Sequence, residues 1–145
     1  MSRTFKAMSA LLTYPTEELL KAIPEIAAAI GQEASFSASV RRQLDALLGE
    51  LAAGDIYDLQ ERYVLLFDRT RLLSLNLFEH VHGESRDRGQ AMIDLKAQYE
   101  NAGLEMGVAE LPDFLPLFLE FLSMRPDAEA HELDRKITRL NSSHT

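Results

Sequence analysis

Apolar residues recur at the spacing of α-helices along most of the 145 residues. The clearest stripe begins after Ser37 or Ser39, either of which can cap a helix, and it ends at Gly54. Its apolar positions follow the i, i+4, i+7, i+8, i+11 pattern of one buried helix face: Val40, Leu44, Leu47, Leu48 and Leu51. No useful length of strand-like alternation occurs. The spacing therefore predicts an all-α fold, a compact helical bundle.

Two helices are expected before this stripe. The first is stopped at Pro15, because the residue preceding a proline disfavours the helical conformation. Thr16 caps the second, Pro24 restarts it, and Gly31 ends it. The N-terminal third of the chain is thus expected to form a small helical unit.

After Gly54 the pattern predicts two more helices joined by a connector. Asp55 caps the first, whose apolar face is Ile56, Leu59, Tyr63, Val64 and Phe67. Residues 68–83 have no regular period, which predicts a bent or packed connector. Ser85 caps the next helix and Gly103 closes it, with an inward face of Ala91, Met92, Leu95 and Tyr99.

Gly89 lies inside that helix, where glycine costs about 1 kcal/mol relative to alanine. Such a glycine suggests that something approaches the backbone closely. Helix–helix packing and a ligand contact are both open at this point.

The apolar stretch 114–122 predicts one further helix. If Asp113 is its cap, Pro116 takes the third position, where a missing N–H leaves no broken bond. The stretch is apolar nearly all round, so this helix is central or lines a groove. Its single charge, Glu120, lies at a rim or pairs with an arginine or histidine.

Composition excludes several classes of protein. The chain has no cysteine, which rules out disulfides, thiolate metal sites and thiol catalysis. No apolar run is long enough for a transmembrane helix. Fifteen Lys and Arg against 23 Asp and Glu give a net charge of −8, which argues against nucleic-acid binding. Residues 68–90 are neutral, with four acids and four bases, so the acidity lies around them.

The densest polar cluster, residues 78–90, raises the question of a metal site. Glu79 and His82 have the i, i+3 spacing of helical di-iron proteins, but neither His131 nor His144 completes a second pair. The sequence around Ser85 lacks the second glycine of a nucleophile elbow, the turn that presents a catalytic serine. We therefore expect no metal, no cofactor and no catalysis.

The last residues differ in character from the rest. Pro126 can begin another helix that carries Ala128 and Leu133. From residue 134 the string DRKITRLNSSHT has no amphipathic stripe and resembles vector read-through. The sequence thus predicts an incomplete helical domain over residues 1–133 and a non-native tail over 134–145.

Several of these strings together resemble the NarJ family of respiratory nitrate reductase assembly chaperones, relatives of TorD and DmsD. The resemblance covers about residues 5–133 and rests on Leu11–Pro15, Tyr63–Arg69, Ser74–Met92, Glu110–Leu117 and Leu119–Leu122. It implies an all-helical, cytoplasmic protein that is not an enzyme. Family members bind the N-terminal segment of the nitrate reductase catalytic (alpha) subunit, hold it competent for molybdenum cofactor insertion and delay its membrane attachment.

A basic, amphipathic leader would lay its apolar face in a groove between helices, with acidic groups at the rim. We expect Asp68, Glu79, Asp113 and Glu120 to meet its cations, and His80 and His82 to make its affinity depend on pH. The whole predicted peptide-binding set is Tyr63, Phe67, Asp68, Leu77, Phe78, Glu79, His80, His82, Arg86, Asp113, Phe114 and Glu120. The alternatives are a chaperone for another molybdoenzyme and a metal-dependent helical enzyme that uses Glu79 and His82.

Overall fold

The computed structural model describes residues 2–81, 86–107 and 110–126. Within these ranges the secondary structure is helical, joined by turns and loops, with an isolated antiparallel bridge between Asn76 and Phe114. The predicted all-α fold is confirmed. In chain order the elements are α1 (Ser2–Leu11), α2 (Glu17–Gly31), α3 (Ala38–Ala53), α4 (Ile56–Tyr63), η1 (Val64–Asp68), η2 (Arg71–Leu73), α5 (Leu77–Val81), α6 (Arg86–Asn101) and α7 (Leu115–Ser123).

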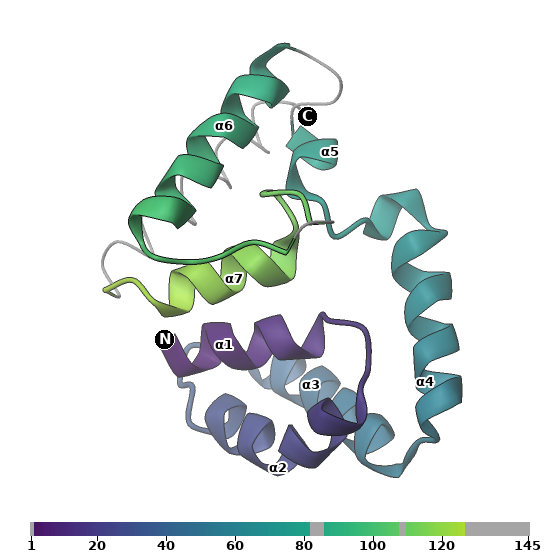
Figure 1. Ribbon diagram of the computed structural model, residues 1–145. Helices are drawn as coiled ribbons and strands as arrows, with labels where there is room; N and C mark the ends of the chain where they lie inside the picture. Colours follow the sequence, from purple (N-terminus) through teal and green to yellow (C-terminus); the bar gives the residue numbers. More distant parts are fainter. Residues whose placement is uncertain (1, 82–85, 108–109, 127–145) are drawn as a thin grey trace.

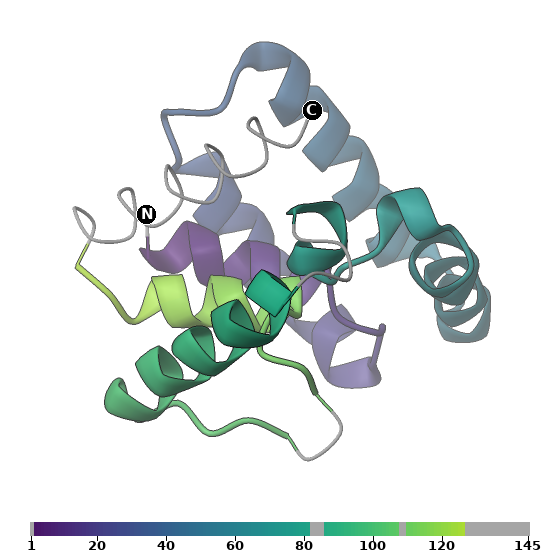
Figure 2. The ribbon, with the colours of Figure 1, turned by 90° about the horizontal axis from the view of Figure 1, so that it is seen from above.

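Helix α7 lies in the middle of the fold, between α6 on one side and α1 on the other (Figure 1). Seen from above, α7 runs alongside α1 (Figure 2). Helix α1 also packs on α2, and α2 packs on α3. The predicted apolar helix is therefore central, and its buried side chains are Pro116, Leu117, Phe118, Phe121 and Leu122.

Two apolar clusters form the core on either side of the α1–α7 pair. The first joins α1, α2 and α3 with Leu59 of α4, and includes the predicted positions Leu44, Leu48 and Leu51 of α3. The second joins Phe78 of α5 to α6 and α7, and the fully buried Tyr99 lies within it. Because α1 borders both clusters, it connects the two halves of the core.

Most helix starts match the sequence prediction. The hydroxyl of Thr16 accepts a hydrogen bond from the Leu19 N–H at 3.1 Å, and Ser37, not Ser39, caps α3. The Asp55 carboxylate accepts from two backbone N–H groups at the start of α4. These caps satisfy donors that would otherwise lack partners at a helix N-terminus. The predicted Ser85 cap and the predicted 134–145 tail lie outside the described residues.

The predicted restart of the second helix at Pro24 is wrong. Helix α2 runs without interruption from Glu17 to Gly31, and Pro24 is exposed inside it. An interior proline costs about 3 kcal/mol relative to alanine. The buried face of α2, which includes Ile23 and Ile26 on either side of the proline, offsets this cost.

The predicted role of Asp113 as the cap of the last helix is also wrong. Phe114 is the N-cap of α7 and makes no side-chain capping bond, so Pro116 is the second helical residue. A proline there still breaks no helical hydrogen bond, because the first N–H groups of a helix have no intrahelical acceptor. The Asp113 carboxylate is used elsewhere, as described below.

Gly89 within α6 and Gly103 just after it are expected to respond in opposite directions to replacement by alanine. A Cβ at Gly89 would meet no atom of the described residues within 4 Å, so helix–helix packing, one of the two interpretations left open for this glycine, receives no support. Gly89→Ala should therefore raise the free energy of unfolding by about 1 kcal/mol. Gly103 has φ +80° and ends the helix, with the Leu104 N–H donating to the Tyr99 carbonyl at 2.9 Å. Gly103→Ala should therefore lower the free energy of unfolding by about 1 kcal/mol. Urea unfolding followed by circular dichroism measures both, and shifts of the same sign would contradict the assignment.

Candidate partner-binding surface

Elements α4, η1 and η2 leave the helical bundle together and form an arm at its side, residues 56–73 (Figure 1). Contacts near its start fix the arm to the bundle. The amide of Gln60 donates to the Pro15 carbonyl at 2.8 Å, and the Tyr63 hydroxyl donates to the Leu12 carbonyl at 2.9 Å. Leu59 is buried in the first core cluster. The arm therefore has a fixed base, and its outer part is η1 and η2.

The outer part of the arm exposes four leucines. Leu65 and Leu66 of η1 are 49% and 38% exposed, and Leu72 and Leu73 of η2 are 84% and 45% exposed. Single exposed apolar residues are common, but a cluster of them along one segment marks a contact surface in soluble proteins. We call these four residues the exposed leucines.

A π-helical turn carries two of these leucines, Leu65 and Leu66. In η1 the Arg69 N–H donates to the Val64 carbonyl five residues earlier at 3.2 Å, and the Thr70 hydroxyl donates to the Leu65 carbonyl at 3.1 Å. A π-helical turn takes up an extra residue and rotates the side chains that follow relative to an α-helix. Such turns occur frequently at functional sites. The predicted apolar face of this segment is partly buried, with Leu59 of α4 as its one buried member.

Three aromatic rings line the inner side of the arm. The Tyr63 ring lies edge-on to that of Tyr14, with centroids 5.7 Å apart, and tilted against that of Phe67 at 4.9 Å. Burial, and then the negative charge of Asp68, raise the pKa of Tyr63 to about 12. The hydroxyl therefore keeps its proton at neutral pH and remains a donor to the Leu12 carbonyl.

We expect this hydroxyl to make stability fall in strong alkali. The pKa of Tyr63 rises from 10.0 to about 12 on folding, so between these values the unfolded chain binds fewer protons and the free energy of unfolding decreases as pH rises. The contribution is fully present below pH 10. Urea titrations across this window should show a smaller decrease for Tyr63→Phe than for the unchanged chain. Tyr57→Phe, at a 76% exposed position, is the matched control, and an effect equal to that of Tyr63→Phe would contradict the assignment.

Asp113 joins the part of the connector that follows the arm, residues 74–78, to the start of α7. Its side chain is 0% exposed, and its two oxygens accept from the Phe78 N–H at 3.0 Å and the Asn76 amide at 3.1 Å. Backbone bonds surround this pair, including the Leu115 N–H to the Leu75 carbonyl at 2.7 Å. Asp113 and the buried Phe78 thus hold the connector in place.

Tyr99 of α6 supports the same region from the other side. Its ring is fully buried against Phe121, with centroids 5.1 Å apart, and its hydroxyl donates to the Pro112 carbonyl at 2.7 Å. Burial first, and then the nearby Asp113, raise the pKa of this phenol. The phenol therefore stays a hydrogen-bond donor, and the backbone beside Asp113 is fixed.

A small acidic hollow lies beside α7. Its volume is about 300 Å³, its apolar wall includes Phe114 and Leu117, and three carboxylates line it: Glu105, Glu110 and Glu120. Glu120 is exposed, which agrees with the rim position that was one of its two predicted roles. The hollow thus combines an apolar wall with negative charge.

The comparison with known proteins identifies the chain's relatives. The profile of a family described as nitrate reductase delta subunit matches residues 33–143. The chain belongs to this family. It is 49% identical over 125 residues to the nitrate reductase molybdenum cofactor assembly chaperone NarJ of Escherichia coli K12, which covers 86% of the chain and 53% of that protein.

Two other relatives of this delta subunit family member are informative. The probable nitrate reductase molybdenum cofactor assembly chaperone NarW of Escherichia coli K12 is 44% identical over 127 residues, 88% of the chain and 52% of that protein. The nitrate reductase-like protein NarX of Mycobacterium tuberculosis H37Rv is 32% identical over 117 residues, 81% of the chain but only 17% of that protein. The chain spans about half the length of these two Escherichia coli chaperones.

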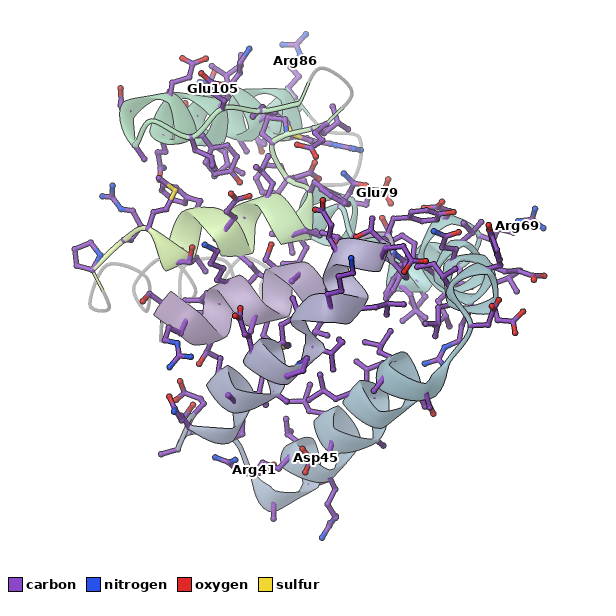
Figure 3. The ribbon with its side chains drawn as sticks, turned by 60° about the horizontal axis from the view of Figure 1, so that its bottom comes forward. Arg41, Asp45, Arg69, Glu79, Arg86 and Glu105 are labelled. Carbon is purple, nitrogen blue, oxygen red and sulfur yellow. The ribbon has the colours of Figure 1, made fainter. Side chains whose placement is uncertain are left out.

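The predicted binding residues of this delta subunit family member fall into separate groups. Tyr63, Phe67 and Asp68 lie on the arm, whereas Leu77 and Phe114 are half-buried at the connector beside Phe78 and Asp113. Glu79 and His80 are exposed on α5, where the His80 Nε2 hydrogen-bonds the Ser74 carbonyl at 2.9 Å. His82 lies outside the described residues. Figure 3 shows Arg86, at the start of α6, pointing away from the bundle.

The predicted set lacked all four exposed leucines, and it lacked two of the acids around the hollow, Glu105 and Glu110. The Leu65-Leu66 pair falls off the predicted apolar stripe, which is a signal that could have marked it as exposed. The two acids are in the loop after α6, where no periodicity places side chains. A metal site receives no support, because the described part of the chain contains no group of three or more possible ligands.

None of the helices in the described ranges is long and apolar enough to cross a membrane. The candidate surface is the arm with its exposed leucines, together with the exposed carboxylates of Asp68 and Glu79.

Proposed function

We propose that this delta subunit family member is an assembly chaperone for a nitrate reductase rather than an enzyme, and that it works in the cytoplasm. Two relatives that match more than four-fifths of the chain are named nitrate reductase molybdenum cofactor assembly chaperones. A segment similar to this chain also forms part of a longer nitrate reductase-like protein. These names support a role in maturation of that enzyme.

Among the structural observations, the exposed leucines support this proposal most directly. An enzyme needs convergent catalytic groups in a cleft, whereas a chaperone needs an accessible apolar surface for a segment of its client. The arm offers such a surface over η1 and η2, and Leu72 is 84% exposed on it. Because the base of the arm is fixed, binding of a client would cost little conformational entropy in the arm.

The client segment that fits this surface is basic and amphipathic. We propose that it is the N-terminal segment of the nitrate reductase catalytic subunit, bound with its apolar face on the exposed leucines. Asp68 and Glu79 are exposed at the two ends of the region that carries η2, so they can meet arginine or lysine beside the leucines. In Figure 3, Glu79 lies between Arg86 and Arg69, which point outward. The net charge of −8 would speed the approach of a basic segment.

Titration calorimetry with a synthetic peptide of that N-terminal segment tests the proposal. We expect a Kd of about 1 μM or tighter, a binding free energy of about −8 kcal/mol. The affinity should weaken at high salt because part of it is electrostatic. A peptide of the same composition in scrambled order is the control, since it keeps the charge and loses the apolar face.

Two outcomes would change the proposal. No heat above that of the scrambled peptide would contradict binding of this segment. Tighter binding of the leader segment from a different molybdoenzyme, measured in competition, would assign the chain to that enzyme instead.

A further inference from the structure

The outer face of α6 presents a row of exposed residues along the whole helix. Its buried face is formed by Leu95 and Tyr99, and Figure 3 shows Arg86 on the opposite side, pointing away from the bundle. Four more exposed positions follow Arg86 at steps of three or four residues, so they lie on the same face as that arginine. We call these five residues the outer row: Arg86, Gly89, Ile93, Ala97 and Glu100.

Two members of the outer row are unfavourable for the fold by itself. Gly89 destabilises a helix relative to alanine, and no atom of the described residues comes within 4 Å of where its Cβ would be. Ile93, one turn later, is 63% exposed. A glycine allows another backbone to approach closely, and the distance between packed helices depends on the residues at the contact. Together the two residues suit the packing of a second helix across this face.

The outer row is complementary to a reversed copy of itself. Arg86 lies seven residues before Ile93 and Glu100 lies seven after it, whereas Gly89 and Ala97 lie four before and four after. In an antiparallel pair of α6 helices with a twofold axis at Ile93, each Arg86 therefore faces the Glu100 of the other copy. Neither charged side chain forms an ion pair or a hydrogen bond in the part of the chain that the structure describes.

We propose that two copies of this chain associate through the outer row, with their α6 helices antiparallel about a twofold axis at Ile93. The two Arg86–Glu100 contacts set the register, and Gly89 opposite Ala97 permits a close approach. One helix pair buries less than the roughly 1,200 Å² of stable complexes, so we expect a weak dimer with a Kd of about 100 μM. The exposed leucines belong to η1 and η2 and take no part in this pairing.

The absence of cysteine allows a direct test by cross-linking of the whole chain. Ile93→Cys places the two thiols of a dimer next to each other at the axis. Tyr57→Cys is the matched control, at a 76% exposed position on α4. With a short bis-maleimide at about 100 μM protein, we expect several-fold more covalent dimer from Ile93→Cys than from the control. Equal yields would overturn the proposal.

Charge reversal tests the register of the pairing by sedimentation equilibrium. Arg86→Glu and Glu100→Arg should each raise the dimer Kd about tenfold, and the chain that carries both changes should recover the original Kd. The two positions are fourteen residues apart, roughly 21 Å along the helix, so recovery requires contact between two copies. Net charge alone predicts opposite effects of the two single changes, because one makes the chain more negative and the other less.

Circular dichroism of each variant checks that the helical fold is retained. Single variants that dimerise as well as the unchanged chain would contradict the proposal, and so would a double variant that stays as weak as the single ones. An unchanged chain that sediments as a monomer at about 1 mM would also overturn it. Because these measurements use no peptide, their outcome is independent of whether the arm binds the client.

Discussion

Replacing Asp113 with alanine is expected to lower the free energy of unfolding by about 3 kcal/mol. The substitution leaves the buried Phe78 N–H and the Asn76 amide without their shared acceptor. Unsatisfied buried donors cost more than the net value of the bonds that they lose. Both donors belong to the connector that links the arm to the bundle, so the variant should also loosen the base of the candidate surface. Urea unfolding monitored by circular dichroism measures the change.

Asp113→Asn is the matched control for this prediction. Its side-chain carbonyl can still accept one of the two hydrogen bonds, so the loss should be about half as large. An alanine variant as stable as the unchanged chain would contradict the structural role. An asparagine variant that keeps its stability but loses peptide binding would show that Asp113 meets a cation of the client, as the sequence prediction had it.

Leu72→Asp should weaken binding of the catalytic-subunit peptide by about 100-fold. The change removes a side chain whose burial would contribute about 2 kcal/mol, and it requires the client's apolar face to desolvate a carboxylate. Because Leu72 is 84% exposed, the free energy of unfolding should stay within about 0.5 kcal/mol of its original value. Calorimetric titration of the folded variant measures the affinity.

Ile93→Asp controls for the added negative charge and for the loss of an exposed apolar residue. Ile93 is 63% exposed on α6, away from the arm. Its replacement should leave the peptide affinity within about twofold of the original. If both variants weaken binding equally, the client does not bind on the exposed leucines.

Local signals made much of this fold predictable. Thr16, Ser37 and Asp55 cap helices where the sequence placed them, because an N-cap acts within its own three or four residues. Gly103 ends α6 for the same local reason, through its left-handed backbone. The apolar run 114–122 identified a central helix, since a helix without a polar face must be covered on all sides.

Features that depend on distant partners were not predictable in this way. Asp113 forms its hydrogen bonds with residues 35 and 37 positions away, so its local spacing from Pro116 suggested a cap that the fold does not use. The π-helical turn at Val64–Asp68 departs from the α-helical period on which the stripe was counted, and no local spacing indicated it. Pro24 stays inside a helix because buried neighbours hold it there, which no local rule records.

The pairing of α1 with α7 has a consequence for the order of folding during synthesis. The Ser9–Pro116 bond joins residues 107 positions apart, so closing this loop costs chain entropy that grows with the logarithm of its length. At typical translation rates of about 5–20 residues per second, α1 waits roughly 5–20 s for its partner helix to emerge. During that interval α1 to α3 can collapse on their own cluster, while the face of α1 that will meet α7 stays open. Early release of a shortened chain would therefore leave that face exposed to aggregation.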